Sequence, residues 1–141
     1  MAGVRITDRE ITKAELSNIY DDFKEIERRD GVPDSPQVRY SYTADEDGEV
    51  VGFISGLTNH KWFFISDLWV HENHRRQGLG SKILAMLEGK LKSIGIRHVY
   101  LWTSGLINPI FYEKHGYKVF TVFEDFFEVE GYNHIGYRKD F

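Results

Sequence analysis

A nearly continuous apolar run, from Trp62 to Val70, limits the possible folds more than any other feature of the sequence. Only Ser66 and Asp67 interrupt it, and its aromatic and β-branched side chains favour a strand. Because hydrophobic residues occupy both alternating sets of positions, we expect a central strand that is buried on both faces. Helical patterns before and after this run indicate that strands and helices share one core.

Strand and helix signals alternate along the rest of the chain. Thr12 and Glu15 form a capping-box pattern that opens a helix. Asp47-Gly48 is typical of the turn in a hairpin, and Gly56 within that hairpin indicates a bulge or a close approach of the backbone. The expected strands cover residues 4–7, 38–43, 50–57, 62–70, 99–102, 117–123 and 132–138, and the expected helices cover 12–30, 78–94 and 109–115. This order predicts a mixed α/β fold, with three to four helices on a mostly antiparallel sheet of six to seven strands.

The helix expected at residues 78–94 has one apolar side. Glu88 and Lys92 stand four residues apart, so we expect them to pair on the opposite, solvent-facing side. Gly95 then ends the helix. The apolar stripe consists of Leu79, Ile83, Met86, Leu87, Leu91 and Ile94.

Length and composition exclude several classes of protein. With 141 residues, the chain is expected to form one domain over residues 1–141. Its 18 Lys and Arg against 22 Asp and Glu give a net charge of −4, which argues against a general nucleic-acid binder. The absence of cysteine excludes disulfides, thiolate metal ligands and a cysteine nucleophile. No secretory signal and no apolar run of about 18 residues is visible, so we expect a cytoplasmic protein without a membrane span.

Three cationic residues and two glycines lie together after the central strand. Arg75, Arg76 and Lys82 surround Gly78 and Gly80, where the second long helix is expected to start. A helix start offers unpaired N–H groups and the positive end of the helix dipole, and glycines let a phosphate come close to the backbone. Guanidinium groups add charge-assisted hydrogen bonds. The segment therefore predicts a site for a diphosphate.

Two common phosphate-binding motifs do not fit this segment. The P-loop requires Gly-Lys followed by Ser or Thr, whereas the order here is Gly80-Ser81-Lys82. The dinucleotide pattern G-x-G-x-x-G fails because position 83 is isoleucine. The pattern that remains is Arg75-x-x-Gly78-x-Gly80 behind a buried strand.

This pattern, behind Asp67-Leu68-Trp69-Val70, resembles the acyl-CoA-binding loop of the GNAT superfamily of N-acetyltransferases. The segment IFYEKHGY, residues 110–117, is similar to a second segment of that family, and the expected order of elements also matches. The resemblance thus covers nearly the whole chain. It implies an acetyl-CoA-dependent N-acetyltransferase with a GNAT-like sheet that is splayed in the middle. A homodimer, which is common in the family, is also expected, and the aromatic Phe126-Phe127 stretch agrees with one.

The resemblance also implies where acetyl-CoA binds. The pantetheine arm would pair with Leu68, Trp69 and Val70, in the opening between this strand and the strand that ends at Trp102. Asn108 either contacts pantetheine or only caps the helix that begins at Pro109, and both interpretations stay open. The side chains of Arg75 or Arg76 would assist with the diphosphate. Backbone N–H groups would hold that diphosphate at Arg76, Gln77, Gly78, Leu79, Gly80 and Ser81.

Tyr112 matches the tyrosine that the family directs at the CoA sulfur, so it is the candidate general acid. A packed core tyrosine is the competing interpretation. Many members carry a glutamate base on the central strand, but the corresponding residue here is Phe64. Asp67 and His71 are candidate catalytic substitutes, and deprotonation through water without a dedicated base is an equal alternative. His71 and His74 have no accompanying carboxylate cluster with zinc spacing, so no metal is expected.

The acceptor is expected to be a primary amine of a small molecule or a protein. Tyr20, Tyr40 and Phe126 either shape its pocket or belong to the core. An acyl-CoA-binding regulatory or interaction module without catalysis is the alternative function, because Phe64 cannot accept a proton. A binding protein for some other nucleotide is a third possible function. It holds only if the similarity of residues 110–117 to the family segment is a coincidence. Acidic residues that would suit a cationic amine are Asp21, Asp22, Glu25, Glu124, Asp125, Glu128 and Glu130.

Overall fold

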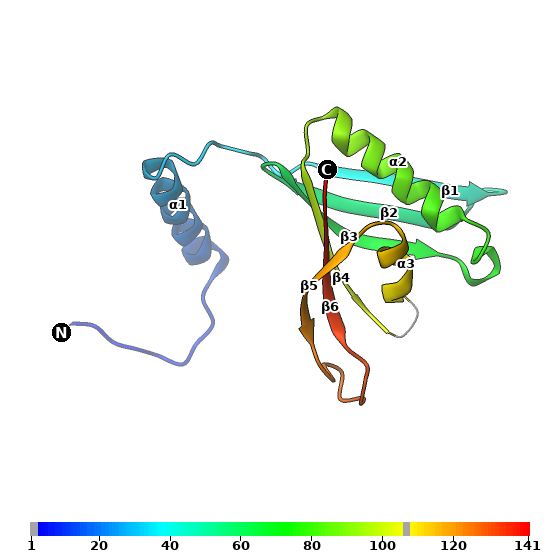
Figure 1. Cartoon of the computed structure of the whole chain (residues 1–141). Helices are drawn as coiled ribbons and strands as arrows, with labels where there is room; N and C mark the ends of the chain where they lie inside the picture. The colour runs from blue at the N-terminus through cyan, green and yellow to red at the C-terminus, as the bar shows by residue number, and fades with distance from the viewer. Residues whose placement is uncertain (1–2, 106–107) are drawn as a thin grey trace. The chain divides into compact units, whose positions relative to one another are not determined.

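The chain forms two compact units in the computed structural model, which describes residues 3–105 and 108–141 (Figure 1). The first unit spans Met1–Ser35 and the second Pro36–Phe141. The single domain expected from the length stays a prediction. The elements are α1 (Lys13–Arg29), β1 (Arg39–Glu46), β2 (Glu49–Asn59), β3 (Trp62–Val70), the 3₁₀ helix η1 (Glu72–His74), α2 (Leu79–Ser93), β4 (His98–Ser104), α3 (Asn108–Lys114), β5 (Lys118–Phe123) and β6 (His134–Asp140).

The first unit is built around α1, whose start confirms the predicted capping box. The Glu15 backbone N–H donates to Thr12 Oγ1 at 3.1 Å, and the Thr12 N–H donates to Glu15 Oε1 at 2.8 Å. The strand predicted at residues 4–7 is wrong, because these residues belong to no strand of the described chain. An alternating segment of this length is not stable as a strand unless another strand pairs with it.

The second unit contains a six-stranded sheet in the order β1-β2-β3-β4-β6-β5. All neighbouring pairs are antiparallel except β3 and β4, which run parallel with α2 as their connection. The predicted mixed α/β fold, with a mostly antiparallel sheet of six to seven strands, is therefore confirmed. Across the described residues, no helix combines the length and the hydropathy that crossing a membrane requires.

The sheet opens between β3 and β4. These strands pair only from Trp62 with His98 to Ile65 with Leu101, although both continue for several residues. Beyond that point β3 stays paired with β2, as far as Val70, while β4 stays paired with β6. Two pairs of strands thus diverge from one junction, and we call this opening the split. It is the splayed sheet that the family resemblance implied.

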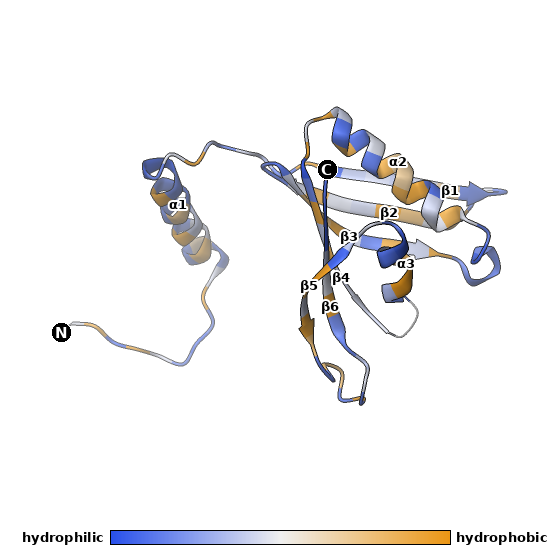
Figure 2. Cartoon of the chain, viewed as in Figure 1, coloured by the Kyte–Doolittle hydropathy of each residue, from blue (hydrophilic) through white to orange (hydrophobic). Residues whose placement is uncertain are grey.

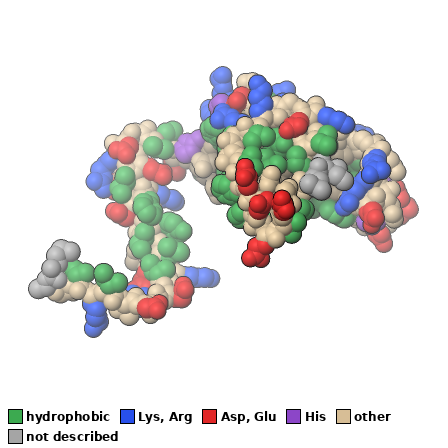
Figure 3. Space-filling model, turned by 60° about the horizontal axis from the view of Figure 1, so that its bottom comes forward, with side chains coloured by type: hydrophobic (Ala, Val, Ile, Leu, Met, Phe, Trp, Pro, Cys, Tyr) green, Lys and Arg blue, Asp and Glu red, His purple; other side chains and the backbone are tan. Residues whose placement is uncertain are grey.

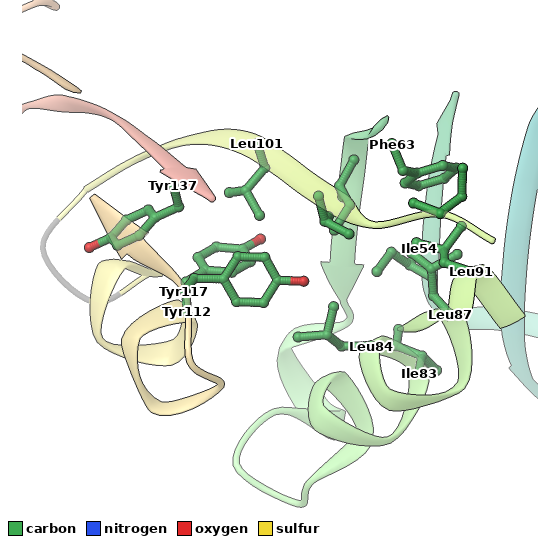
Figure 4. Close-up of a cluster of buried hydrophobic side chains, with 13 residues drawn as sticks. Ile54, Phe63, Ile83, Leu84, Leu87, Leu91, Leu101, Tyr112, Tyr117 and Tyr137 are labelled. Atoms are coloured by element: carbon green, nitrogen blue, oxygen red, sulfur yellow. The ribbon is translucent and has the colours of Figure 1, made fainter. Parts of the chain in front are cut away.

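A hydrophobic core lies between one face of the sheet and the helices α2 and α3 (Figure 4). Leu84, Leu87 and Leu91 of α2 are buried, and hydrophobic and hydrophilic residues alternate along this helix (Figure 2). The predicted apolar stripe was partly wrong, since Met86 is 48% exposed and Leu84 takes its place. The expectation that β3 is buried on both faces was also wrong. Phe63 and Ile65 are buried on the helix side, but none of the alternate residues of β3 is.

Glu88 does not pair with Lys92 as the four-residue spacing predicted. It is buried and accepts bonds from Lys139 Nζ at 2.9 Å and from Tyr117 OH at 2.8 Å. A buried carboxylate needs such partners, because the low-dielectric interior otherwise opposes its charge. Glu88 therefore links α2 to β6 and to the segment that follows α3.

Gly56 confirms the predicted bulge and close approach. The register between β2 and β3 shifts between Ser55 and Gly56, so Ser66 is the extra residue on β3. A Cβ at Gly56 would lie 2.2 Å from the Phe64 carbonyl oxygen and 2.4 Å from the Phe63 ring. Only glycine fits there. The bulge lies where the split begins, and it changes which side chains of β3 face each side of the sheet.

Candidate functional site

The loop at residues 71–78 carries the chain from β3 to α2 and is held against the end of β3. His71 Nδ1 accepts a bond from the Asn73 N–H at 3.1 Å, which closes the start of η1. Arg75 Nε donates to the Val70 carbonyl at 2.9 Å. Arg75 therefore uses part of its guanidinium to fix the loop to the strand. The phosphate contact of Arg75 stays a prediction.

The N-terminus of α2 has no side-chain cap among the described residues. Gly78 is the N-cap residue with φ of 81°, in the left-handed region. Arg76, two residues earlier, has φ of 62°, which is uncommon for a residue with a Cβ. The first intrahelical bond runs from the Lys82 N–H to the Gly78 carbonyl at 3.0 Å. The N–H groups of Leu79, Gly80 and Ser81 therefore precede the hydrogen-bonded ladder of the helix.

This helix end fits a diphosphate. A Cβ at Gly78 would meet no atom within 4 Å, so the space next to the backbone is open. Arg76 and Lys82 are exposed beside it, and their charges add to the positive end of the helix dipole. A hollow of about 340 Å³ adjoins the helix start, and its lining includes Gly78 and Lys82 but also Asp45 and Glu46.

In the described chain, the split leaves one edge of β3 without a partner strand next to this helix start. From Ser66 onward, β3 has β2 on one side and no strand on the side toward β4. Leu68 packs against the core, and Val70 pairs with Gly52. Trp69, between them, is 39% exposed. Backbone groups along such an edge bind an extended ligand as a strand is bound. The predicted pantetheine-binding residues thus come together with the predicted diphosphate-binding residues.

Tyr112 lies on α3 within a cluster of aromatic rings. Its ring centroid is 5.8 Å from that of Tyr117 and 5.9 Å from that of Tyr137. The side chain is 7% exposed, and burial raises the pKa of Tyr112 to about 12 (Figure 4). The phenol therefore keeps its proton at neutral pH, as a general acid must. The same burial agrees with the competing interpretation of Tyr112 as a core residue.

His115, which the sequence analysis did not single out, connects α3 to the helix start. Its Nε2 lies 2.9 Å from Ser81 Oγ, and its ring centroid is 4.7 Å from that of Phe111. Phe111 in turn lies against Gly80, where a Cβ would be 3.5 Å from the ring. The spacing of three residues between Tyr112 and His115 could have shown that both lie near one side of α3. The pair Ser81–His115 ties the expected diphosphate site to the helix that carries Tyr112.

The remaining predicted site residues take separate positions. Asp67 is exposed on β3, where its Oδ2 accepts a bond from Ser66 Oγ at 2.9 Å. Asn108 is the first residue of α3, and its Nδ2 donates to the Ser104 carbonyl at 3.3 Å. That bond joins α3 to the end of β4. Gln77 is exposed in the loop, and its Nε2 donates to the Asn73 carbonyl at 3.4 Å.

Two histidines, His74 and His98, each bond to a single carboxylate. His74 Nε2 bonds Glu46 Oε2 at 3.0 Å, and the ring of His71 packs edge-on against that of His74. Within residues 3–105 and 108–141, no three His, Asp or Glu side chains come together as a metal site would need. The roles expected for His71, Asp67 and Asn108 at the site stay predictions.

The comparisons with known proteins agree with this geometry. The profile of the acetyltransferase (GNAT) family matches residues 8–117. The chain is similar to a blasticidin-S acetyltransferase of Streptomyces morookaense, with 29% identity over 91 residues, which is 64% of this chain and 67% of that protein. It is also similar to a crystal structure of an acetyltransferase from Bacillus cereus, with a TM-score of 0.80, 28% identity, and coverage of 96% of this chain and 98% of that one.

A third similarity bears on the ligand. The fold is shared with an aminoglycoside 6′-N-acetyltransferase that was solved in complex with coenzyme A. The TM-score is 0.64 at 20% identity, with coverage of 94% of this chain and 95% of that one. The predicted class, an acetyl-CoA-dependent acetyltransferase, is confirmed through the family. The chain therefore belongs to the acetyltransferase (GNAT) family.

Proposed function

We propose that the protein transfers the acetyl group of acetyl-CoA directly to a primary amine of a small molecule or a protein, with both substrates bound together. One observation carries the proposal: the split between β3 and β4 opens beside the uncapped start of α2. This combination offers an edge for the pantetheine arm and a cationic end for the diphosphate. The similar Streptomyces protein is named a blasticidin-S acetyltransferase, which supports acetyl transfer as the reaction.

The residues at the split have distinct tasks in this proposal. A backbone N–H near Val70 faces the thioester carbonyl and stabilises negative charge that develops on its oxygen. The new C–N bond forms as the C–S bond breaks, the amine loses one proton, and the sulfur gains one. Tyr112 delivers the proton to sulfur, since its raised pKa keeps the phenol protonated. The proton of the amine passes to Asp67, to His71 or to water.

A panel of primary amines, assayed by thiol release from acetyl-CoA, tests this function. Tyr112→Phe should lower kcat by about 100-fold and leave the affinity for acetyl-CoA nearly unchanged, because a general acid acts only in the transition state. Arg76→Ala should remove most of the thermal protection that acetyl-CoA provides, and Lys90→Ala, on the exposed side of α2, is the matched control. No CoA binding at millimolar concentration would refute the proposal.

An acyl-CoA-binding module without catalysis is the second candidate function. Phe64 favours it, because the resemblance implies a glutamate base at this position. The Phe64 ring instead packs 5.0 Å from the ring of Tyr100, where it cannot accept a proton. Calorimetric binding of CoA, together with no thiol release across the whole amine panel, would select this alternative.

We further propose a cytoplasmic homodimer. The outer strands β1 and β5 end the sheet, and β5 carries the exposed side chains of Val119 and Val122. Apolar side chains on an edge strand are typical of a surface that another chain covers. One chain has a mass of 16.5 kDa. Light scattering of the purified protein at micromolar concentration should give twice that mass.

A further inference from the structure

The sheet has a second face at the split, opposite the helices α2 and α3, which we call the open face. Ile54 belongs to the helix-side core and pairs with Leu68, so both point to the helix side. Their neighbours Ser55 and Asp67, which also pair, therefore point to the open face. Trp69, two residues after Asp67, follows it to the same face. The bulge at Ser66 is what places the Asp67 carboxylate there.

Strand β4 brings a second tryptophan to the open face. Tyr100 pairs with Phe64, and their rings lie 5.0 Å apart on the side away from the helices. Trp102 follows Tyr100 by two residues, so it points the same way, and it is the first residue after the last pair with β3. Asp67 and Trp69 thus line one side of the split, and Trp102 lines the other.

From Trp102 the aromatic surface continues across β6 as a stack of nearly parallel rings, which we call the ring ladder. The His134 ring lies 4.8 Å from Trp102 at an angle of 6°, and 4.8 Å from Phe126 at 21°. Phe123 packs 5.2 Å from Trp102. His134 Nδ1 lies 2.9 Å from Ser104 Oγ, which fixes the plane of the imidazole. The ladder is therefore a preformed stacking surface that starts at the split.

The surroundings of the ring ladder are acidic. Residues 119–137 contain four carboxylates and no lysine or arginine. These carboxylates are exposed, as are Phe126 and Phe127. Acidic and hydrophobic side chains lie next to one another on the surface of the second unit (Figure 3). The carboxylates are Glu124, Asp125, Glu128 and Glu130.

These observations define a ligand chemistry. Aromatic faces attract organic cations and stack on flat rings. Carboxylates attract the same cations and disfavour anions. A surface with both features, at the point where the split opens, suits a positively charged amine on a flat ring. Arg39 also reaches this face, where its Nη1 donates to Ser55 Oγ at 2.8 Å. The carboxylates outnumber it, so they favour a cationic acceptor over an anionic one.

We propose that the open face at the split is the acceptor site, and that the acceptor is an arylalkyl or heteroarylalkyl ammonium. The inference rests on the proposed function, which it makes specific. The ammonium lies between Trp69 and Trp102 with Asp67 as its counter-ion, and the flat ring lies along the ring ladder. The ammonium releases one proton to water before the amine attacks. Asp67 binds the charged form in this proposal and does not take the proton.

Calorimetry on the enzyme saturated with CoA tests the ligand class with three probes of similar size. Phenethylamine carries both the charge and the flat ring, 2-cyclohexylethylamine keeps the charge without an aromatic face, and 2-phenylethanol keeps the ring without the charge. Phenethylamine should bind about tenfold tighter than either of the other two, which corresponds to about 1.4 kcal/mol. Equal binding of 2-phenylethanol would refute the cation site, and equal binding of 2-cyclohexylethylamine would refute the stacking site.

Variants test the named residues. Asp67→Asn should raise KM for phenethylamine about tenfold with little change in kcat, and Asp67→Glu should restore much of the affinity. A fall in kcat at constant KM would instead make Asp67 the base and would overturn the proposal. Trp102→Leu should weaken the binding of phenethylamine but not the binding of 2-cyclohexylethylamine. Because Trp102 is partly buried and its loss could impair folding, the exposed Phe126→Leu provides a second variant, with an expected loss of about threefold.

The controls separate this inference from the proposed function. Phe126→Leu should retain the wild-type affinity for CoA, because Phe126 lies outside the split, outside the loop at 71–78 and outside α2. Should CoA bind and thiol be released with aliphatic amines at the same efficiency as with phenethylamine, only the acceptor class is refuted. Should CoA fail to bind, the proposed function itself fails.

Discussion

The two long helices begin in opposite ways. The start of α1 is closed by its own side chains, since Thr12 and Glu15 exchange two hydrogen bonds and Arg9 adds an ion pair with Glu15 at 3.0 Å. The start of α2 is left-handed at Gly78 and has no side-chain cap in the described chain. A closed helix start has used its donors, whereas an open one can offer them to a ligand. The difference shows that a weak local signal for a helix start can mark a functional site.

The helices also differ in the origin of their polar partners. The ion pairs of α1 are local, such as the one between Arg28 and Glu25, three residues apart. The buried Glu88 of α2 bonds to Tyr117 and Lys139, 29 and 51 residues away in sequence. Local pairs near the surface contribute little, whereas a partly buried network ties a helix firmly to its neighbours. Four predictions test this contrast: two use substitutions and two use a change of pH.

Closing the start of α2 should have the largest effect. Gly78→Asp places a carboxylate where the diphosphate is expected, so the affinity for acetyl-CoA should fall by a factor of about 100 or more. Gly78→Asn is the matched control, because it has the same shape without the charge and asparagine tolerates the left-handed region. Calorimetry should show a much smaller loss for asparagine. Equal losses in both variants would mean that shape, and not charge, governs the site.

Removing the distant partner of α2 should have the next largest effect. Glu88→Ala leaves Lys139 and Tyr117 without their buried acceptor, so the free energy of unfolding should fall by about 2–3 kcal/mol. Lys92→Ala removes the partner that the sequence spacing predicted for Glu88. This variant should lower the free energy of unfolding by about 0.5 kcal/mol or less. Urea unfolding measures both. A similar fall for the two variants would contradict the pairing seen in the structure.

Alkaline pH should weaken the core beside α2 and α3. Burial raises the pKa of Tyr112 from its ordinary 10.0 to about 12. Its stabilising contribution is therefore complete below pH 10 and is lost as the pH rises from 10 to 12, because the unfolded chain releases the proton first. The loss is on the order of 2 kcal/mol. In urea titrations over this range, Tyr112→Phe should lose less stability than the wild type, and an identical pH profile would contradict a buried, protonated Tyr112.

Acid should act on α1 with the smallest effect. The bond from Arg9, and then those from Thr12, lower the pKa of Glu15 from 4.5 to about 2. The contribution of Glu15 is present above pH 4.5 and is lost as the pH falls toward 2. Circular dichroism should detect a slight loss of helix over this range that Glu15→Gln does not show. Thr12→Ala should lower the helix signal slightly at pH 7, without changing the affinity for acetyl-CoA.

Local patterns in the sequence correctly indicated many elements. The capping box of α1, the turn at Asp47-Gly48, the bulge at Gly56 and the glycine start of α2 all depend on residues that are close in sequence. Hydrogen bonds and backbone angles over a few residues decide such features, so no knowledge of distant contacts was needed. The same local patterns predicted that the loop at residues 71–78, with Gly80 and Ser81, forms one candidate site.

Other features depended on residues far apart in the chain. Residues 4–7 looked like a strand, but no other strand pairs with them in the described structure. Glu88 looked exposed, but packing of β6 and Tyr117 against α2 buries it. The bond between His115 and Ser81 forms because the tertiary structure places the end of α3 beside the start of α2. A single sequence contains no direct signal for such contacts, because each one depends on how complete elements pack.

The sequence alone therefore determined where the helices and most strands form and which residues can meet a diphosphate, since backbone angles and short-range hydrogen bonds follow from neighbouring residues. The tertiary structure decided where the sheet opens, which face Asp67 and Trp102 share, and which partner the buried Glu88 takes. Those outcomes follow from strand register and from burial, which are properties of the assembled fold.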